Sequence, residues 1–416
     1  MAHDIAQLEQ RRAPGSGRSR GRRALRPSSP VAYILLYAAL YAAFGVASPF
    51  WPKLFESKGL VPQQIGLVLA AGLVVRLAAG PLVGRLADHL GSLRLVLACS
   101  AVASAATAAA FLATSSFWPV LVVAVAQAAA LAPTTSLADA LAVNAARPAR
   151  KAGTPFEYGW IRGAASLAFL LGTLAIGQLI SPHDLAPVIW LNAGLLLAAA
   201  VATAAVPAAT PRHHPHADAP VATDVRRLLE ISPFRAVIAV SALVYGSHAL
   251  YDAFAVIRWS DAGLSPSVIS ALWSEAVAAE VIVFLLVGPV LIKRLGARGA
   301  AVLAAVAGIV RWSLMGFTSS VVLLATLQPL HGLTFALLHL ACMRVMAKVV
   351  PHGIAATAQA FYAFGAGLVT AALTWASGTL YVAYGGRAFL WMTGLCVVAL
   401  PVAWFGFGRD DKAPVR

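Results

Sequence analysis

Charged side chains are scarce in this chain of 416 residues. They make up 11% of the sequence, whereas a typical soluble domain is about 25% charged. Hydrophobic residues make up 60% and stand in long unbroken runs, which excludes a water-soluble globular protein. Short segments of alternating polarity are lacking, so a membrane β-barrel is excluded as well.

Catalytic and metal-binding motifs are also lacking. The three cysteines (Cys99, Cys342 and Cys396) lie in apolar runs and have neither zinc-site nor disulfide spacing. There is no Walker loop and no GxSxG motif. His248 and Asp252 match the HxxxD spacing of some acyltransferases, but this match stands alone. We therefore expect no metal, no cofactor and no enzymatic activity.

The apolar runs predict an all-α polytopic membrane protein. A helix needs about 20 apolar residues to cross a bilayer, and twelve segments of the chain qualify. They begin near Val31, Ile65, Leu93, Phe117, Tyr158, Pro187, Val237, Val268, Ala300, Val321, Ile354 and Phe389.

Basic residues are concentrated in the predicted loops and tails on one side of the membrane. The net charge is +15, and an N-terminus in the cytoplasm places 23 of the 31 lysines and arginines on that side, as the positive-inside rule requires. This distribution indicates a lipid bilayer rather than nucleic acid as the partner. We expect a bacterial-type inner membrane protein that has both termini in the cytoplasm and functions as a monomer.

Polar stretches divide the chain into two halves of six helices. We expect a disordered basic cytoplasmic tail (residues 1–30), an N-terminal half (31–206), a cytoplasmic linker (207–234), a C-terminal half (235–408) and a short cytoplasmic tail (409–416). The linker contains His213, His214 and His216, a cluster typical of solvated linkers and not assigned to a metal.

The halves resemble each other at an offset of 204 residues. Tyr41 then matches Tyr245, Tyr158 matches Tyr362, Pro62 matches Pro266 and Arg94 matches Arg298. Internal duplication is typical of transporters whose halves rock around a central site. The same offset places Arg76 opposite Glu280, so that a base and an acid occupy equivalent places near mid-membrane.

Eight charged residues lie inside the predicted spans. They are Arg76, Asp139, Arg162, Asp252, Glu275, Glu280, Arg311 and Arg344. Each costs about 2.5–3.5 kcal/mol at the centre of a helix, so they must pair or face a wet cavity.

Depth along the helices suggests which charges meet. Asp139 and Arg162 form a predicted pair, which is either functional or a static brace. Glu280, Arg311 and His331 are expected to meet in the second half. Tyr245, His248 and Asp252 share one face of the seventh span. Arg344 could instead extend to the interface, and Glu275 could face an outer vestibule without a role.

A loop motif lies between the second and third spans. It runs Gly84-Arg85-Leu86-Ala87-Asp88-His89-Leu90-Gly91-Ser92-Leu93-Arg94 and resembles the signature of the major facilitator superfamily. The resemblance implies a gating latch formed by Gly84, Asp88, Gly91 and Arg94; a plain hairpin turn is the alternative. The second half has Ile292 where Asp88 would fall, which indicates a one-sided latch.

Several stretches resemble the phenylpropionate permeases, which are close to the lactose-permease-like proton symporters. They include Gly72–Arg76, Asp139–Ala142, Ala279–Val281, Leu330–Phe335 and His339–Arg344. The resemblance implies proton-coupled uptake of a small aromatic acid. The related sugar symporters carry a proton-binding carboxylate where this chain has Thr334, so Glu280 is the first candidate for the proton.

The expected partners are thus protons and a small-molecule substrate. The predicted proton-coupling residues are Glu280, Arg311, His331 and His339. The predicted substrate-binding residues are Arg76, Arg311, Trp51, Tyr245, His248, Asp252, Phe254, Trp273 and Phe335. A sugar or nucleoside symporter, a drug or metabolite exporter, and a signalling protein or enzyme without transport remain the alternatives.

Overall fold

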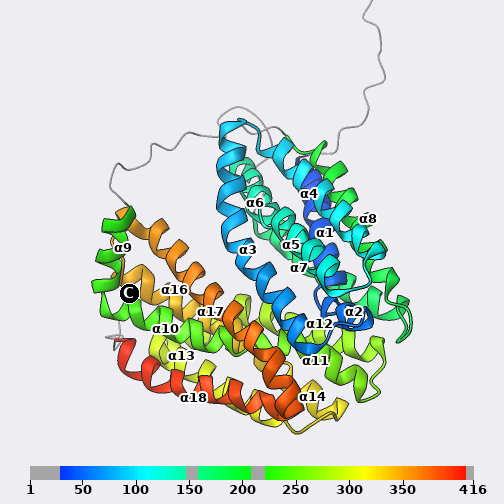
Figure 1. Cartoon of the computed structure of the whole chain (residues 1–416). Helices are drawn as coiled ribbons and strands as arrows, with labels where there is room; N and C mark the ends of the chain where they lie inside the picture. Colours follow the sequence, from blue (N-terminus) through cyan, green and yellow to red (C-terminus); the bar gives the residue numbers. More distant parts are fainter. Residues whose placement is uncertain (1–28, 147–157, 208–220, 409–416) are drawn as a thin grey trace, which may run out of the picture.

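The computed structural model describes residues 29–146, 158–207 and 221–408 (Figure 1). The predicted basic tail, residues 147–157, the three linker histidines and the predicted C-terminal tail lie outside this part of the chain. The described part is helical apart from turns, loops and one isolated bridge between Ser181 and Asp184. Its α-helices are α1 (Ser29–Ala47), α2 (Trp51–Ser57), α3 (Pro62–His89), α4 (Leu93–Ala110), α5 (Phe117–Leu131), α6 (Thr134–Ala146), α7 (Tyr158–Leu179), α8 (Ala186–Thr203), α9 (Val221–Glu230), α10 (Ser232–Gly246), α11 (Ala249–Asp261), α12 (Pro266–Ile282), α13 (Gly288–Met315), α14 (Val321–Leu327), α15 (Leu330–Gly332), α16 (Leu338–Val349), α17 (Ala355–Tyr384) and α18 (Phe389–Gly406).

The membrane crossings confirm the predicted fold class. Ten helical stretches of the described chain are long and apolar enough to span a bilayer, and two of them have 50 and 52 residues. Each of these two contains a glycine with positive φ, Gly296 (φ 69°) or Gly385 (φ 54°), at which the chain turns back. The eight single and two double stretches therefore amount to twelve crossings.

Each half of the chain has its own apolar core. One core packs α1, α4, α6, α7 and α8 together, and the other packs α10, α13, α16 and α18. A third core contains residues from both halves, including Phe50, Ile176, Phe254 and Ile269. The two bundles are thus joined over part of their length and diverge elsewhere, with α3 and α6 well separated from α9 and α16 in Figure 1.

Glycines allow the bundles to touch at one end, which we call the closed end. A Cβ on Gly66 would lie 2.9 Å from the carbonyl oxygen of Thr374, and one on Gly378 would lie 2.5 Å from that of Pro62. Gly177 of α7 meets Ser270 of α12 in the same way. Side chains larger than hydrogen would hold the helices apart at these points.

The opposite end, which we call the open end, contains the loop between α3 and α4. Asp88 and Gly91 are exposed there, and nothing lies within 4 Å of a Cβ placed on Gly84. The predicted latch is therefore not engaged with any described residue of the other bundle. In the described part of the predicted linker, residues 221–230 form α9 and residues 232–234 begin α10. Helix α9 contacts α10 and α17.

The two halves repeat each other in geometry as well as in sequence. Gly59 (φ 83°) and Gly263 (φ 86°) make the same turn before α3 and α12, which begin at Pro62 and Pro266. Arg94 donates to the carbonyl of Val206 at 3.1 Å, and Arg298 donates to that of Phe407 at 2.9 Å. Each arginine thus ties the end of the last helix of its own bundle, so Arg94 has a structural role within its half.

Candidate functional site

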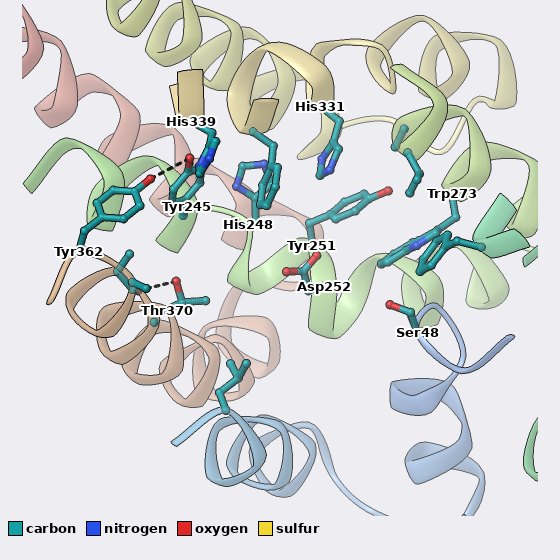
Figure 2. Close-up of a pocket in the computed structure, with 18 residues that line it drawn as sticks. Ser48, Tyr245, His248, Tyr251, Asp252, Trp273, His331, His339, Tyr362 and Thr370 are labelled. Atoms are coloured by element: carbon teal, nitrogen blue, oxygen red, sulfur yellow. Dashed lines mark hydrogen bonds between the residues drawn. The ribbon is translucent and has the colours of Figure 1, made fainter. Parts of the chain in front are cut away.

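Two adjoining cavities lie between the bundles, and they share Ser48, Leu73, Asp252, Trp273 and Thr370 in their walls. The first cavity, of about 450 Å³, is lined mostly by the C-terminal half (Figure 2). The second, of about 500 Å³, is lined mostly by the N-terminal half. Both volumes lie in the range of about 300–1,000 Å³ typical of small-molecule sites.

A break in the seventh span lies near the first cavity. α10 ends at Gly246 and α11 begins at Ala249. Tyr245, His248 and Asp252 flank this break, and all three line the first cavity, as their spacing predicts. His248 has its Nδ1 3.0 Å from the carbonyl of Val244, so this nitrogen carries the proton, and its Nε2 faces the Thr334 hydroxyl at 3.0 Å.

Arg311 of α13 is wholly buried. Its guanidinium lies 4.5 Å from the ring centres of both Tyr251 and Trp312. One Nη donates to His331 Nδ1 at 2.9 Å and the other to Gln328 Oε1 at 3.1 Å. Because a guanidinium has only donors, His331 accepts at Nδ1 and carries its proton on Nε2.

His331 connects Arg311 to Glu280. Its Nε2 lies 3.5 Å from the Glu280 carboxylate, so the imidazole ring separates the base from the acid. The three residues predicted to meet are thus brought together in a line. The direct contact expected between Glu280 and Arg311 is absent, because the ring of His331 stands between them.

Gly332 explains why these side chains are neighbours. A Cβ at this position would lie 2.6 Å from the carbonyl oxygen of Ala279. The close approach brings Glu280, which follows Ala279, next to His331, which precedes Gly332. Each helix then opens into a π-helical turn, at Val283–Val287 and Leu333–Leu337. Such turns are frequent at functional sites.

The other predicted binding residues fall into two groups. Trp273 lines both cavities, Trp51 lines the second, and His339 and Phe335 line the first. Phe254 lines neither; it is fully buried and stacks on Tyr381 at 4.6 Å, so it belongs to the core. Arg311 also lines neither cavity, because Tyr251 and His331 cover it.

The surroundings of Arg76 differ from those of Arg311. It lies at the middle of α3, is exposed, and lines the second cavity. Within the described residues its guanidinium makes no hydrogen bond and no ion pair. A charged group at this depth requires a wet cavity or an anion.

Asp139 and Arg162 are brought together as predicted, at 3.7 Å. Tyr37 and Tyr158 both donate to Asp139 Oδ1 at 2.6 Å, and Arg162 donates to the Tyr41 hydroxyl at 2.6 Å. The acid and the base are both partly exposed, and neither lines the two cavities.

Four polar residues near the cavities were not predicted: Gln127, Asn192, Gln328 and Tyr251. Their signal in the sequence is an amide or a hydroxyl inside an otherwise apolar run, which requires a partner once buried. Gln328 accepts from both Arg311 and Tyr251. Among the described residues, no group of three or more His, Cys, Asp and Glu side chains could hold a metal ion.

Two helical bundles with cavities between them that are lined by charged side chains are typical of membrane transporters. The family model of the MFS_1-like family matches residues 31–393, and the chain belongs to this family of major facilitator transporters, which are not enzymes. The chain is 31% identical over 369 residues to the probable 3-phenylpropionic acid transporter of Escherichia coli (strain K12), covering 88% of this chain and 94% of that relative.

More distant matches agree with this family. The chain is 27% identical over 343 residues to the maltose permease of Geobacillus stearothermophilus, covering 82% of this chain and 83% of that permease. Its fold is similar to that of the nucleoside transporter NupG, with a TM-score of 0.77 at 18% identity over 91% of this chain and 99% of NupG. A D-xylose-proton symporter has a similar fold, with a TM-score of 0.66 at 13% identity over 92% of this chain and 99% of the symporter.

Proposed function

We propose that the protein is a proton-coupled symporter that takes up a small aromatic carboxylate by alternating access. The observation that carries this proposal is the contrast between its two membrane arginines. Arg76 faces the second cavity without a partner, whereas Arg311 is held behind His331. An open arginine at mid-membrane suits an anion, which it can bind with two parallel hydrogen bonds.

The chain from Glu280 through His331 to Arg311 supplies the proton step. A proton on Glu280 removes the negative charge that faces His331 Nε2. His331 lines the first cavity, so a change in its hydrogen bonds is transmitted directly to the cavity wall. Arg311 keeps Nδ1 as an acceptor and thereby directs the Nε2 proton towards Glu280. In this role Arg311 positions His331 and does not bind the substrate.

The positive-inside distribution orients the molecule. We infer from it that the open end, where Asp88 and Gly91 are exposed, faces the cytoplasm. The closed end then seals the outside, and the arrangement corresponds to an inward-open state in which substrate and proton leave. One chain contains both bundles, so a monomer suffices for the cycle.

A sugar symporter is the second candidate, because the maltose permease is among the relatives. A neutral sugar gives no reason for a partnerless arginine at mid-membrane. The related transporter named for 3-phenylpropionic acid supports a carboxylate instead. Competition between carboxylates and sugars for the same site separates the two candidates.

Reconstitution in liposomes tests the proposed function. A pH dye is enclosed, and 3-phenylpropionate is added outside. We expect acidification of the interior that exceeds the rate in protein-free liposomes, which is needed as a control because weak acids cross bilayers unaided. An unchanged rate with protein present, together with sugar-dependent acidification, would replace the carboxylate by a sugar.

A further inference from the structure

Two buried amides in the wall of the second cavity each have one polar atom without a partner. They are Gln127 Nε2 on α5 and Asn192 Oδ1 on α8. The side chains are only 5% and 1% exposed. An unsatisfied buried polar atom costs about 1–3 kcal/mol, so two of them in one cavity wall indicate that a ligand supplies the missing bonds.

The opposite end of each amide is anchored. Gln127 Oε1 accepts from the Thr107 hydroxyl, and Asn192 Nδ2 donates to the carbonyl of Ala43 at 2.9 Å. These bonds fix which atom of each amide is left free. In the wall of the second cavity, Gln127 therefore has a donor and Asn192 an acceptor without a partner.

An acid and a base complete the polar part of this wall. Arg76 and Asp252 both line the second cavity, both are exposed, and neither side chain has a hydrogen bond or an ion pair within the described residues. Asp252 lies in the first turn of α11, where the positive end of the helix dipole favours a negative charge. The cavity thus presents one cation, one anion, one free donor and one free acceptor.

The remaining wall is aromatic. Phe44, Trp51, Phe55, Phe111 and Trp273 line the same cavity of about 500 Å³. Trp51 packs against both Phe55 and Phe111, with ring centres 5.9 and 4.8 Å apart. A flat apolar ring fits this wall, while both ends of a ligand meet polar groups.

We propose that the second cavity selects aromatic carboxylates that carry a hydroxyl group on the ring. The carboxylate pairs with Arg76, the ring packs on the aromatic wall, and the hydroxyl donates to Asp252 or Asn192 Oδ1. Gln127 Nε2 donates to an oxygen of the same ligand. The inference rests on the proposed carboxylate transport and adds the second hydrogen-bonding group of the substrate.

Competition in proteoliposomes tests this selectivity. Uptake of labelled 3-phenylpropionate is inhibited by unlabelled 3-phenylpropionate, by its 2-, 3- and 4-hydroxyphenyl derivatives, or by phenylalanine. We expect at least one hydroxylated acid to inhibit at a concentration about tenfold lower than 3-phenylpropionate, which corresponds to ~1.4 kcal/mol. A site built to bind a hydroxyl discriminates against the analogue that lacks it.

Variants then identify the residues responsible for the preference for hydroxylated acids. Asp252→Leu and Asn192→Leu each remove one of the two possible acceptors, and the variant that removes the acceptor of the hydroxyl group should bring the ratio of inhibitory concentrations close to one. Thr203→Val is the matched control, since Thr203 is a buried polar residue on α8 that lines neither cavity, and it should leave the ratio unchanged. If Asn192→Leu does not fold, the smaller polar change Asn192→Ser takes its place, and Asp252→Leu changes a side chain that is exposed in the cavity.

The outcomes separate this proposal from the proposed function. Equal inhibition by all the acids, or a ratio that survives both Asp252→Leu and the variant at Asn192, overturns the hydroxyl site while 3-phenylpropionate transport stands. Stronger inhibition by phenylalanine overturns it as well and assigns Asp252 to an ammonium group. Absence of protein-dependent carboxylate uptake would contradict the proposed function itself.

Discussion

The two bundles hold their mid-membrane arginines in opposite environments. In the C-terminal bundle Arg311 is buried, and hydrogen bonds join it to His331 and Gln328. In the N-terminal bundle Arg76 is open to the second cavity and has no partner in the described chain. A charge held in a chain of hydrogen bonds responds to a single proton, whereas a free charge is available to an anion. Under the proposed function, the C-terminal bundle couples the proton and the N-terminal bundle binds the substrate.

The tyrosines at equivalent positions show the same division. Tyr41 and Tyr158 belong to the network of Asp139 and Arg162. Their counterparts Tyr245 and Tyr362 contact each other at 3.3 Å and line the first cavity. Duplication therefore kept the aromatic scaffold, while the charges in each half diverged.

Glu280→Gln is expected to have the largest effect of the variants considered, on proton-driven accumulation. The amide cannot accept a proton, so we expect the accumulation of 3-phenylpropionate driven by a proton gradient to fall to simple equilibration. Exchange of substrate across the membrane should continue, because the cavities are unchanged. Both are measured in proteoliposomes, with Glu275→Gln on the same helix as the control. Accumulation at the wild-type level in Glu280→Gln would remove this residue from the proton step.

Arg76→Gln should weaken substrate binding without uncoupling transport. Loss of a charge-assisted hydrogen bond costs about 1.5–3 kcal/mol, which corresponds to a KM higher by roughly 10- to 150-fold. Arg76→Lys should retain part of the affinity, because a point charge remains but the planar fork is lost. Concentration dependence of uptake measures both.

Arg311→Lys tests whether the two arginines have different roles. Lysine cannot hold His331 and Gln328 with a planar fork, so coupling should fall while the KM rises less than it does in Arg76→Gln. If instead the KM in Arg311→Lys rises as much as in Arg76→Gln, Arg311 reaches the substrate and the division between the bundles is wrong.

The sequence predicted the fold well, because long apolar runs and the repeat at 204 residues survive in a single chain. It also brought Glu280, Arg311 and His331 together, since depth along a helix follows from counting residues at 1.5 Å each. It could not predict which charges face the cavity. Arg76 and Arg311 both lie near mid-membrane. What distinguishes them is the surroundings of Arg311, which packs against the rings of Tyr251 and Trp312 and is hydrogen-bonded to two further side chains.

The packing of individual side chains also could not be predicted from the sequence. Phe254 stands one helical turn from aromatic and polar positions of the cavity, but it points into the core against Tyr381. Gln127 and Asn192 have no counterparts in any charge pattern, so counting charges overlooks them. Their importance follows only from the bonds that one end of each amide makes.

Gly332→Ala tests the contact that joins acid and histidine. The added methyl would lie 2.6 Å from the Ala279 carbonyl oxygen, so α12 and α15 must separate. Overpacking of this kind costs about 1–3 kcal/mol. We expect a Tm lower by a few degrees and a coupling ratio reduced several-fold. Gly394→Ala is the control, because nothing lies within 4 Å of its Cβ position. Equal coupling in both variants would make the close approach dispensable.

The smallest expected effect concerns the ion pair that crosses between the bundles at the closed end. Lys53 Nζ lies 3.1 Å from Asp261 on the C-terminal bundle and 2.6 Å from Glu56 on its own helix. Asp261→Asn removes only the bond between the bundles. Exposed pairs contribute about 0.2–1 kcal/mol, so the population of the state closed at this end should fall by only about 1.4- to 5-fold relative to the alternative state.

Spin labels at positions 90 and 294, on opposite bundles at the open end, measure that population as a distribution of distances. Asp261→Asn should increase the fraction with short distances, and Glu56→Gln should not, because the bond between the bundles remains. High salt should reproduce the effect of Asp261→Asn in the wild type, since it screens exposed charges. An identical shift in both variants would mean that the negative charge near Lys53 matters, and not its position on the opposite bundle. A shift in Asp261→Asn alone would identify Lys53 as the charge through which one bundle holds the other closed.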